Sequence, residues 1–197
     1  MLHRIDNGDA LSALLEDNRL GTFVLGPGFG RPDMARDYVR RLGSRRLVLD
    51  ADGISAFRDC PDILFKAFEG DLRLVLTPHD GEFARLFPDL AADPALSKVD
   101  RARRAAARAN AVVVLKGADT VIAAPDGRAL VNDNAPPWLA TAGSGDVLSG
   151  IIGAHLAQGM PAFEAAAAAV WRHGAAGARA GEGLTAETLV DAIAPLA

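Results

Sequence analysis

Short apolar runs alternate with longer amphipathic stretches over the first 115 residues of the chain. Four runs rich in Val and Leu predict buried strands at residues 22–25, 46–49, 72–76 and 111–115. Stretches of helical length and pattern lie before and between them, at residues 9–17, 33–42, 61–69 and 97–110. Because these strands are apolar along their whole length and are separated by helices, the pattern predicts a parallel sheet covered on both faces.

The pattern changes after residue 115. Residues 120–124 and 128–131 flank a Pro-Asp-Gly turn at residues 125–127 and predict a β-hairpin. Three further helices are predicted, at residues 145–158, 161–180 and 185–194. No repeat, low-complexity segment or break in composition divides the chain, so we expect a single α/β domain.

Composition narrows the class of protein. The 197 residues are 50% hydrophobic and 23% charged, which favours a globular domain with a substantial core. The net charge of -4 argues against sequence-independent binding of nucleic acid. The single cysteine excludes an intrachain disulfide framework and a metal site built from cysteines, and no apolar run reaches the ~18 residues of a membrane helix. We therefore expect a cytoplasmic protein that acts on small molecules, with neither nucleic acid nor membrane as a partner.

A glycine-rich segment, Gly-Pro-Gly-Phe-Gly at residues 26–30, lies between the first predicted strand and the next helix. Glycines let backbone amides approach a ligand closely, and the helix N-terminus that follows favours an anion. Asp50 ends the next strand, as in a dinucleotide-binding fingerprint, but Arg31 follows Gly30 and the third glycine is missing. A ligand-facing loop of another fold is favoured, while a Rossmann site and a purely structural turn stay open.

Two more segments follow predicted strands. His79, in Leu-Thr-Pro-His-Asp-Gly-Glu-Phe at residues 76–83, comes at the carboxyl end of a strand, where open α/β sheets bind ligands. An exposed histidine in a helix-capping turn is an equally good interpretation. Lys116, in Val-Leu-Lys-Gly-Ala-Asp-Thr at residues 114–120, is one of three lysines and suits a phosphate. Its alternative is a surface lysine in a β-turn.

The most informative segment is Thr-Ala-Gly-Ser-Gly-Asp-Val-Leu-Ser-Gly at residues 141–150, which runs into a long predicted helix. Free amides at such a helix start form an anion hole for a phosphate group or its transition state. Asp146 lies in the first turn, where a carboxylate could take the proton from a hydroxyl that attacks a phosphoryl group. The alternative role of Asp146 is to favour the helix dipole, worth ~0.5 kcal/mol.

Other polar residues point less clearly to a site. We expect His155 in the core and His173 packed between helices. A cluster of basic residues on one predicted helix is interpreted as a solvated face: Lys98, Arg101, Arg103, Arg104 and Arg108.

Taken in order, five segments resemble the C-terminal YjeF-type family, the ADP- or ATP-dependent NAD(P)H-hydrate dehydratases of the ribokinase-like superfamily. They are the four segments above together with Leu-Asp-Ala-Asp-Gly at residues 49–53. Each motif alone is modest, but five in the same order with matching spacing make a specific signal, and the resemblance runs from about residue 11 to the end. It implies a three-layer α/β/α fold with a mainly parallel central sheet.

The resemblance also implies roles for single residues. The glycine loop, with Gly28 and Gly30, and His79 would contact the hydrated nicotinamide dinucleotide, and Asp146 would be the catalytic residue facing its hydroxyl. The adenine nucleotide, ADP or ATP, would be held by Lys116, Gly117, Ala118, Asp119, Thr120, Gly143, Ser144 and Gly145. The family reaction phosphorylates the ring hydroxyl, and phosphate then leaves to restore NADH or NADPH. Mg²⁺ is expected on the nucleotide, although the sequence contains no dedicated metal cage.

The chain departs from the family pattern in two places. Asp80 stands where the family more often has proline, and few residues precede Gly26, where family domains have additional strands. We therefore expect residues 1–197 to form one ribokinase-like domain that lacks N-terminal elements, and to associate as a homo-oligomer. Two alternatives stay open: a ribokinase-like kinase of a small alcohol such as a vitamin precursor or sugar, and a non-catalytic nucleotide-binding fragment.

Overall fold

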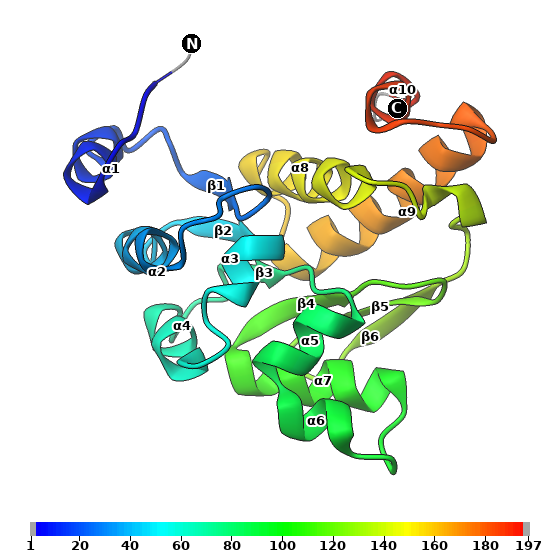
Figure 1. Cartoon of the computed structure of the whole chain (residues 1–197), viewed down its shortest axis with the longest axis horizontal. Coiled ribbons are helices and arrows are strands. Elements are labelled where there is room, and N and C mark those ends of the chain that lie inside the picture. The colour runs from blue at the N-terminus through cyan, green and yellow to red at the C-terminus, as the bar shows by residue number, and fades with distance from the viewer. Residues whose placement is uncertain (1–2, 195–197) are drawn as a thin grey trace.

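One six-stranded sheet organises the computed structural model, which describes residues 3–194 (Figure 1). Its strands follow each other in chain order: β1 (Thr22–Leu25), β2 (Arg46–Leu49), β3 (Leu74–Leu76), β4 (Ala111–Leu115), β5 (Thr120–Ala123) and β6 (Ala129–Asn132). Strands β1 to β4 are parallel, whereas β5 and β6 are antiparallel to their neighbours. Leu25, Leu49 and Leu76 lie in register, so the carboxyl ends of the parallel strands share one edge.

The connections between the parallel strands cover one face of the sheet. They comprise α2 (Pro32–Arg41), α3 (Ala51–Ser55), α4 (Pro61–Ala67), α5 (Asp80–Leu86), α6 (Pro88–Ala92) and α7 (Lys98–Ala109), while α1 (Gly8–Leu15) packs against α2. The strands contribute Leu47, Leu49 and Leu74 to this side, and all three are fully buried. Fully buried aromatic rings from the connections, Phe57, Phe68 and Phe87, fill the layer between.

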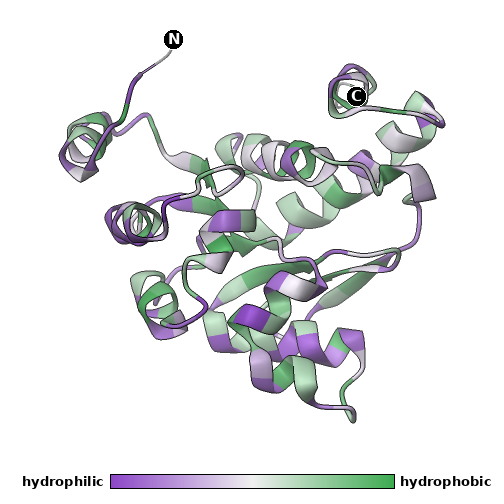
Figure 2. Ribbon diagram, in the orientation of Figure 1, coloured by the Kyte–Doolittle hydropathy of each residue, from purple (hydrophilic) through white to green (hydrophobic). Residues whose placement is uncertain are grey.

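The opposite face is covered by α8 (Ser144–Ala157) and α9 (Ala162–Ala180). The alternate strand residues Val48, Val75 and Val112 point to this side, as strand periodicity requires. Figure 2 shows the apolar residues concentrated on the strands and on the inner sides of these helices. The short 3-10 helix η1 (Pro137–Leu139) and α10 (Ala186–Asp191) complete the chain. The expected three-layer α/β/α fold with a mainly parallel sheet is thereby confirmed.

The predicted elements all form, with shifted ends. β3 begins two residues later than predicted, and α10 is shorter, ending at Asp191. Helices α3 and α6 were not predicted, because segments of five residues are too short to show helical periodicity. For α5, only the start was anticipated, in the helix-capping turn at His79. Across residues 3–194, no helix has both the length and the apolar character needed to cross a membrane.

Candidate active site

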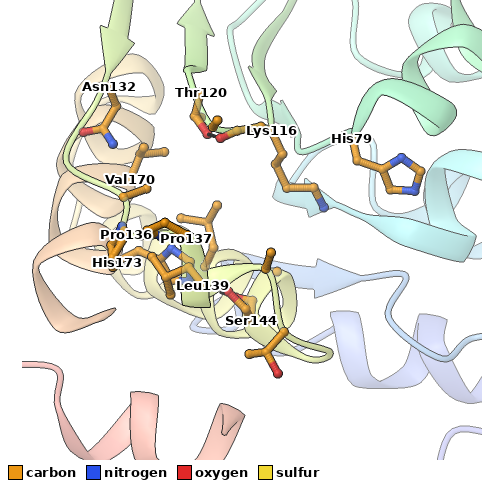
Figure 3. Close-up of a pocket in the computed structure, with 17 residues that line it drawn as sticks. His79, Lys116, Thr120, Asn132, Pro136, Pro137, Leu139, Ser144, Val170 and His173 are labelled. Carbon is orange, nitrogen blue, oxygen red and sulfur yellow. Dashed lines mark hydrogen bonds between the residues drawn. The ribbon is translucent and has the colours of Figure 1, made fainter. Parts of the chain in front are cut away.

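A cavity of about 730 Å³ opens where the carboxyl ends of the central strands meet the start of α8 (Figure 3). Its polar side is lined by residues from three segments that sequence analysis singled out: His79, Lys116, Gly117, Ala118, Thr120, Ser144 and Gly145. These segments lie far apart in the chain, and the parallel order of β3 and β4 brings the first two together. The fold thus brings six of the eight residues predicted to hold the nucleotide around one space.

The start of α8 offers backbone amides to this cavity. Gly143 precedes the helix with φ 82° and ψ -11°, a left-handed conformation that favours glycine. No side chain caps the helix, so the amides of its first turn donate to no side-chain acceptor. An uncapped N-terminus of a helix this long carries partial positive charge and suits an anion such as phosphate.

Lys116 places a cation beside these amides. Its Nζ lies 2.9 Å from Asp50 Oδ1 and 3.9 Å from Glu82 Oε2. A Cβ atom built on Gly145 would lie only 3.3 Å from the same nitrogen, so the ammonium group is adjacent to the first turn of α8. Asp50 is only 1% exposed, and a buried carboxylate of this kind requires a paired cation. The two carboxylates therefore hold Lys116 at the helix N-terminus.

Asp50 does not perform the ribose-binding role of a Rossmann site. Its carboxylate is enclosed by Lys116 Nζ, by Ser149 Oγ at 2.7 Å and by the amide of Ala51 at 2.9 Å. The consecutive strand order also lacks the reversal at which dinucleotide folds bind their cofactor. The Rossmann interpretation of the glycine loop is therefore wrong.

His79 combines both of the roles that sequence analysis left open. Its Nδ1 accepts a hydrogen bond from the Gly81 amide at 2.9 Å and so caps α5, while Glu82 Oε2 accepts from the His79 amide at 2.8 Å. His79 also lines the cavity, and its Nε2 lies 3.3 Å from Glu82 Oε1. The cap fixes the imidazole at the edge of the site.

His173 is packed between α8 and α9, as predicted, but it also lines the cavity. Its Nε2 lies 2.9 Å from the carbonyl oxygen of Ser144 and 3.1 Å from the Ser144 hydroxyl. Since a carbonyl only accepts, Nε2 carries the proton. Burial lowers the pKa of His173 below its usual value and favours the neutral ring. This contact holds the first residue of α8, a role that the sequence did not reveal.

The cavity also has an apolar wall, which sequence analysis missed. It is formed by Pro136, Pro137, Leu139, Leu148 and Val170. Trp138 Nε1 donates to the Gly177 carbonyl at 2.9 Å and thereby attaches η1 to α9. The apolar segment 136–139 between the hairpin and α8 was the available signal. Such a wall suits a flat, weakly polar ring system.

The glycine loop lies beside the site but not in the same cavity. A Cβ atom on Gly26 would lie 1.8 Å from the Asp50 carbonyl oxygen, so only glycine allows β1 to approach β2 in this way. Gly28 and Gly30 both have positive φ, 65° and 61°. The Gly30 amide donates to Asp52 Oδ2 at 3.0 Å, and Gly30 lines a second, smaller cavity of about 430 Å³. The loop is thus placed at the sheet edge expected for a ligand.

Besides Gly28 and Gly30, three predicted residues lie outside the lining of the larger cavity: Asp119, Gly143 and Asp146. Asp146 is exposed on the first turn of α8, directly after Gly145, and Gly143 precedes that turn. Asp119 instead accepts from Lys98 Nζ at 2.7 Å, and this hydrogen bond lowers the pKa of Asp119. Lys98 is therefore half-buried, which corrects its assignment to a solvated face, whereas Arg103 and Arg104 are exposed as expected.

The acidic residues of the site are compatible with magnesium bound through a nucleotide. Within residues 3–194, no group of three or more His, Cys, Asp or Glu side chains is arranged as a metal cage. Mg²⁺ in nucleotide sites takes only one or two carboxylates, together with phosphates and water. Glu82 lies beside Lys116 and supplies one carboxylate near the place where the phosphates would lie. Both oxygens of Asp50 are already occupied by Ser149, Lys116 and the Ala51 amide, so Asp50 does not fit this role.

Comparison with known proteins places the chain in a family. A family model described as NAD(P)H-hydrate dehydratase matches residues 1–195. The ADP-dependent (S)-NAD(P)H-hydrate dehydratase of Neisseria meningitidis is 38% identical over 195 residues, covering 96% of this chain and 66% of that protein. The bifunctional NAD(P)H-hydrate repair enzyme Nnr of Gloeobacter violaceus is 45% identical over 155 residues, covering 78% of this chain and 29% of that protein. The chain thus spans less than two thirds of each of these relatives.

Solved structures agree with this placement. The ADP/ATP-dependent NAD(P)H-hydrate dehydratase of Bacillus subtilis, co-crystallised with ATP/Mg²⁺ and soaked with CoA, superposes with a TM-score of 0.72 at 29% identity. That match covers 86% of this chain and 63% of the other. A ribokinase-like protein of Enterococcus faecalis has a TM-score of 0.76 at 24% identity over 94% of this chain and 66% of its own, a likeness of fold.

Proposed function

Because the chain belongs to the NAD(P)H-hydrate dehydratase family, we propose that its protein repairs hydrated NADH and NADPH, using ADP or ATP as the phosphoryl donor. The observation that carries the proposal is the position of Lys116. Its ammonium group lies against Gly145 at the uncapped start of α8, in a cavity with one apolar wall. A cation beside free amides binds phosphate, and the apolar wall accommodates a purine ring.

In this proposal the nucleotide lies along the larger cavity. Its base packs on the wall formed around Pro136 and Pro137, and its phosphates extend to Lys116 and the first turn of α8. The turn after β4, from Gly117 to Thr120, and the turn from Gly143 to Gly145 supply the backbone that borders the phosphates. Positive charge and amides arranged in advance stabilise the charge that develops during phosphoryl transfer.

Asp146 acts as the catalytic residue at this end of the cavity. Its carboxylate takes the proton from the ring hydroxyl of the substrate while that oxygen attacks the terminal phosphorus of the nucleotide. The phosphorus–oxygen bond to the nucleotide breaks, and AMP or ADP leaves. The carbon–oxygen bond of the new phosphate ester then breaks, and inorganic phosphate leaves with the electron pair of that bond. A proton is lost from the adjacent ring carbon, and the ring double bond of NADH or NADPH is restored. Exposure of Asp146 leaves room for a large substrate.

Magnesium, when bound with the nucleotide, would neutralise phosphate charge, and Glu82 is the residue that would hold it, together with the phosphates and water. His79 and the loop of Gly28 and Gly30 are proposed to contact the hydrated dinucleotide. Gly30 borders the smaller cavity, so we infer that the long dinucleotide spans from His79 toward that space.

We further propose that the protein acts in the cytoplasm and forms a homo-oligomer from copies of a single domain. The acidic composition and lone cysteine support the compartment. Exposed apolar side chains on the edge strand β6, Leu130 and Val131, support association.

The proposal is tested by incubating the protein with hydrated NADH, Mg²⁺ and either ADP or ATP, and following absorbance at 340 nm. Recovery that depends on the nucleotide is expected. If a small alcohol supplied in place of hydrated NADH is converted to a stable phosphate ester, a kinase would be favoured instead. Nucleotide binding measured by calorimetry, with no turnover of either kind, would favour a non-catalytic module.

A further inference from the structure

We propose that Ser149 is a positioning residue for nucleotide binding: through Asp50, it fixes the ammonium group of Lys116 against the phosphate-binding start of α8. The inference rests on the proposed function only in taking the ligand to be a nucleotide that carries phosphates. Ser149 lies outside the lining of the cavity, and it acts through two other residues rather than by touching the ligand.

The contacts form a continuous chain from α8 to the cavity. Ser149 Oγ donates to Asp50 Oδ2 at 2.7 Å. The other oxygen, Asp50 Oδ1, accepts from Lys116 Nζ at 2.9 Å and from the Ala51 amide at 2.9 Å. Both carboxylate oxygens are therefore occupied, and the orientation of the carboxylate depends on Ser149 on one side and Lys116 on the other.

Helix geometry explains why a serine at this position matters. Ser149 follows Gly145 by four residues in α8, so the two lie on the same face of the helix, one turn apart. Asp50 comes from the end of β2 and Lys116 from the turn after β4. The hydroxyl thus ties both loops to the same helix that carries the amides. The distance between the Lys116 ammonium and the first turn of α8 is set within one short network.

The Ser149 hydroxyl is buried, so its hydrogen bond to Asp50 matters for the structure of the site. Ser149 is 0% exposed, and a buried hydroxyl costs free energy unless its hydrogen bonds are made. Thr77 Oγ1, at 3.4 Å, is the other polar group near it, and that hydroxyl also lies 3.3 Å from the Leu49 carbonyl. The short bond to Asp50 is charge-assisted and therefore the dominant one. Without it, Asp50 could turn, and the Lys116 ammonium would follow it away from the cavity.

A double-mutant cycle on ATP affinity tests the proposal by calorimetry. Ser149→Ala is expected to weaken ATP binding about tenfold, the effect of losing one hydrogen bond to a charged group. Lys116→Met keeps the length of the side chain but removes the charge, and in that background Ser149→Ala should weaken ATP binding no further. Adenosine, which carries no phosphate, should lose no affinity when Ser149 alone is replaced.

A matched control separates positioning from a general loss of stability. Ile152→Val removes one fully buried methyl group from the same helix and destabilises the fold by about 0.5–1.5 kcal/mol without touching the network. It should leave ATP affinity within about twofold of the wild type. Should Ser149→Ala fail to fold, Ser149→Cys provides a side chain of similar size that donates only weakly.

The proposal is overturned if Ser149→Ala binds ATP as tightly as the wild type, or if it loses the same factor in the Lys116→Met background. A wild type that binds no ATP would overturn it together with the proposed function. If Ser149 and Lys116 are coupled in ATP affinity as expected but no NADH is recovered, the positioning role of Ser149 stands and only the dehydratase activity is contradicted.

Discussion

Lys116 and Asp146 lie in different environments, which indicates different roles for the two residues. Lys116 is held by two buried carboxylates and faces the start of α8, whereas Asp146 is exposed one residue after Gly145. A cation fixed in this way suits binding, and an acidic residue open to a large ligand suits proton transfer. Replacing either should therefore change different kinetic quantities.

Asp146→Asn is expected to abolish measurable dehydration and leave nucleotide binding nearly intact. The amide keeps the shape of the side chain but cannot take the proton from the attacking hydroxyl, a loss of about 10²–10⁴ in rate. Steady-state kinetics and calorimetry on the same preparation check the two parts. Asp80→Asn, an acidic residue exposed at the start of α5, serves as control and should retain turnover. A variant at position 146 with wild-type turnover would remove Asp146 from the mechanism.

Because His173 is buried, the stability of the folded protein should fall at low pH. Burial lowers the pKa of His173 in the folded protein below its unfolded value near 6.5, so below that pH the unfolded state binds more protons. Its contribution to stability is complete above about pH 6.5 and is lost as pH falls through the folded pKa. His173→Asn should therefore show a smaller fall in Tm between pH 7 and pH 5 than the wild type, measured by thermal unfolding. An equal fall in both proteins would contradict the assignment.

At the scale of elements, periodicity explains most of what sequence could predict. The apolar runs of β2 and β4 gave correct strand bounds because both strands are largely buried between two layers. The bounds of β1 were also correct, although this edge strand is only partly buried and its Val24 is exposed. The motifs predicted Lys116 directly after a strand and Ser144 at the start of a helix, and the structure has Lys116 after β4 and Ser144 as the first residue of α8. The apolar segment 136–139 was visible in the sequence, but its position at the cavity could not be predicted, because η1 contacts α9 only through tertiary packing. The contact between Asp50 and Ser149, 99 residues apart, has no local signal either.

Because η1 packs closely on α9, a substitution at Gly177 in α9 should disturb the apolar wall of the cavity. A Cβ atom on Gly177 would lie within 3 Å of three atoms of Leu139, which lines the cavity. Gly177→Ala should therefore displace the apolar wall and weaken ATP and adenosine binding by a similar factor, in contrast to Ser149→Ala. Gly150→Ala is the matched control, because nothing lies within 4 Å of its Cβ position. Gly150→Ala should leave the affinity for ATP and adenosine unchanged. Its free energy of unfolding, measured in denaturant, should rise by roughly 0.5–1 kcal/mol.

At the scale of the whole molecule, the fold brings two cavities to one edge of the sheet. The larger has the cation, amides and apolar wall that suit a nucleotide, and the smaller borders Gly30. Asp146 and His79 are the predicted substrate contacts associated with the larger one. Family membership follows from the match over residues 1–195, whereas the proposed activity requires both ligands to reach this edge of the sheet together.

The most direct test of that activity measures two products at once. Hydrated NADH, Mg²⁺ and ATP are supplied to the wild-type protein, and the absorbance at 340 nm is followed together with released inorganic phosphate. One phosphate should be released for each NADH restored, at equal rates, and neither product should form with Asp146→Asn. Phosphate release without recovery of NADH, or recovery without a nucleotide, would contradict the proposed activity.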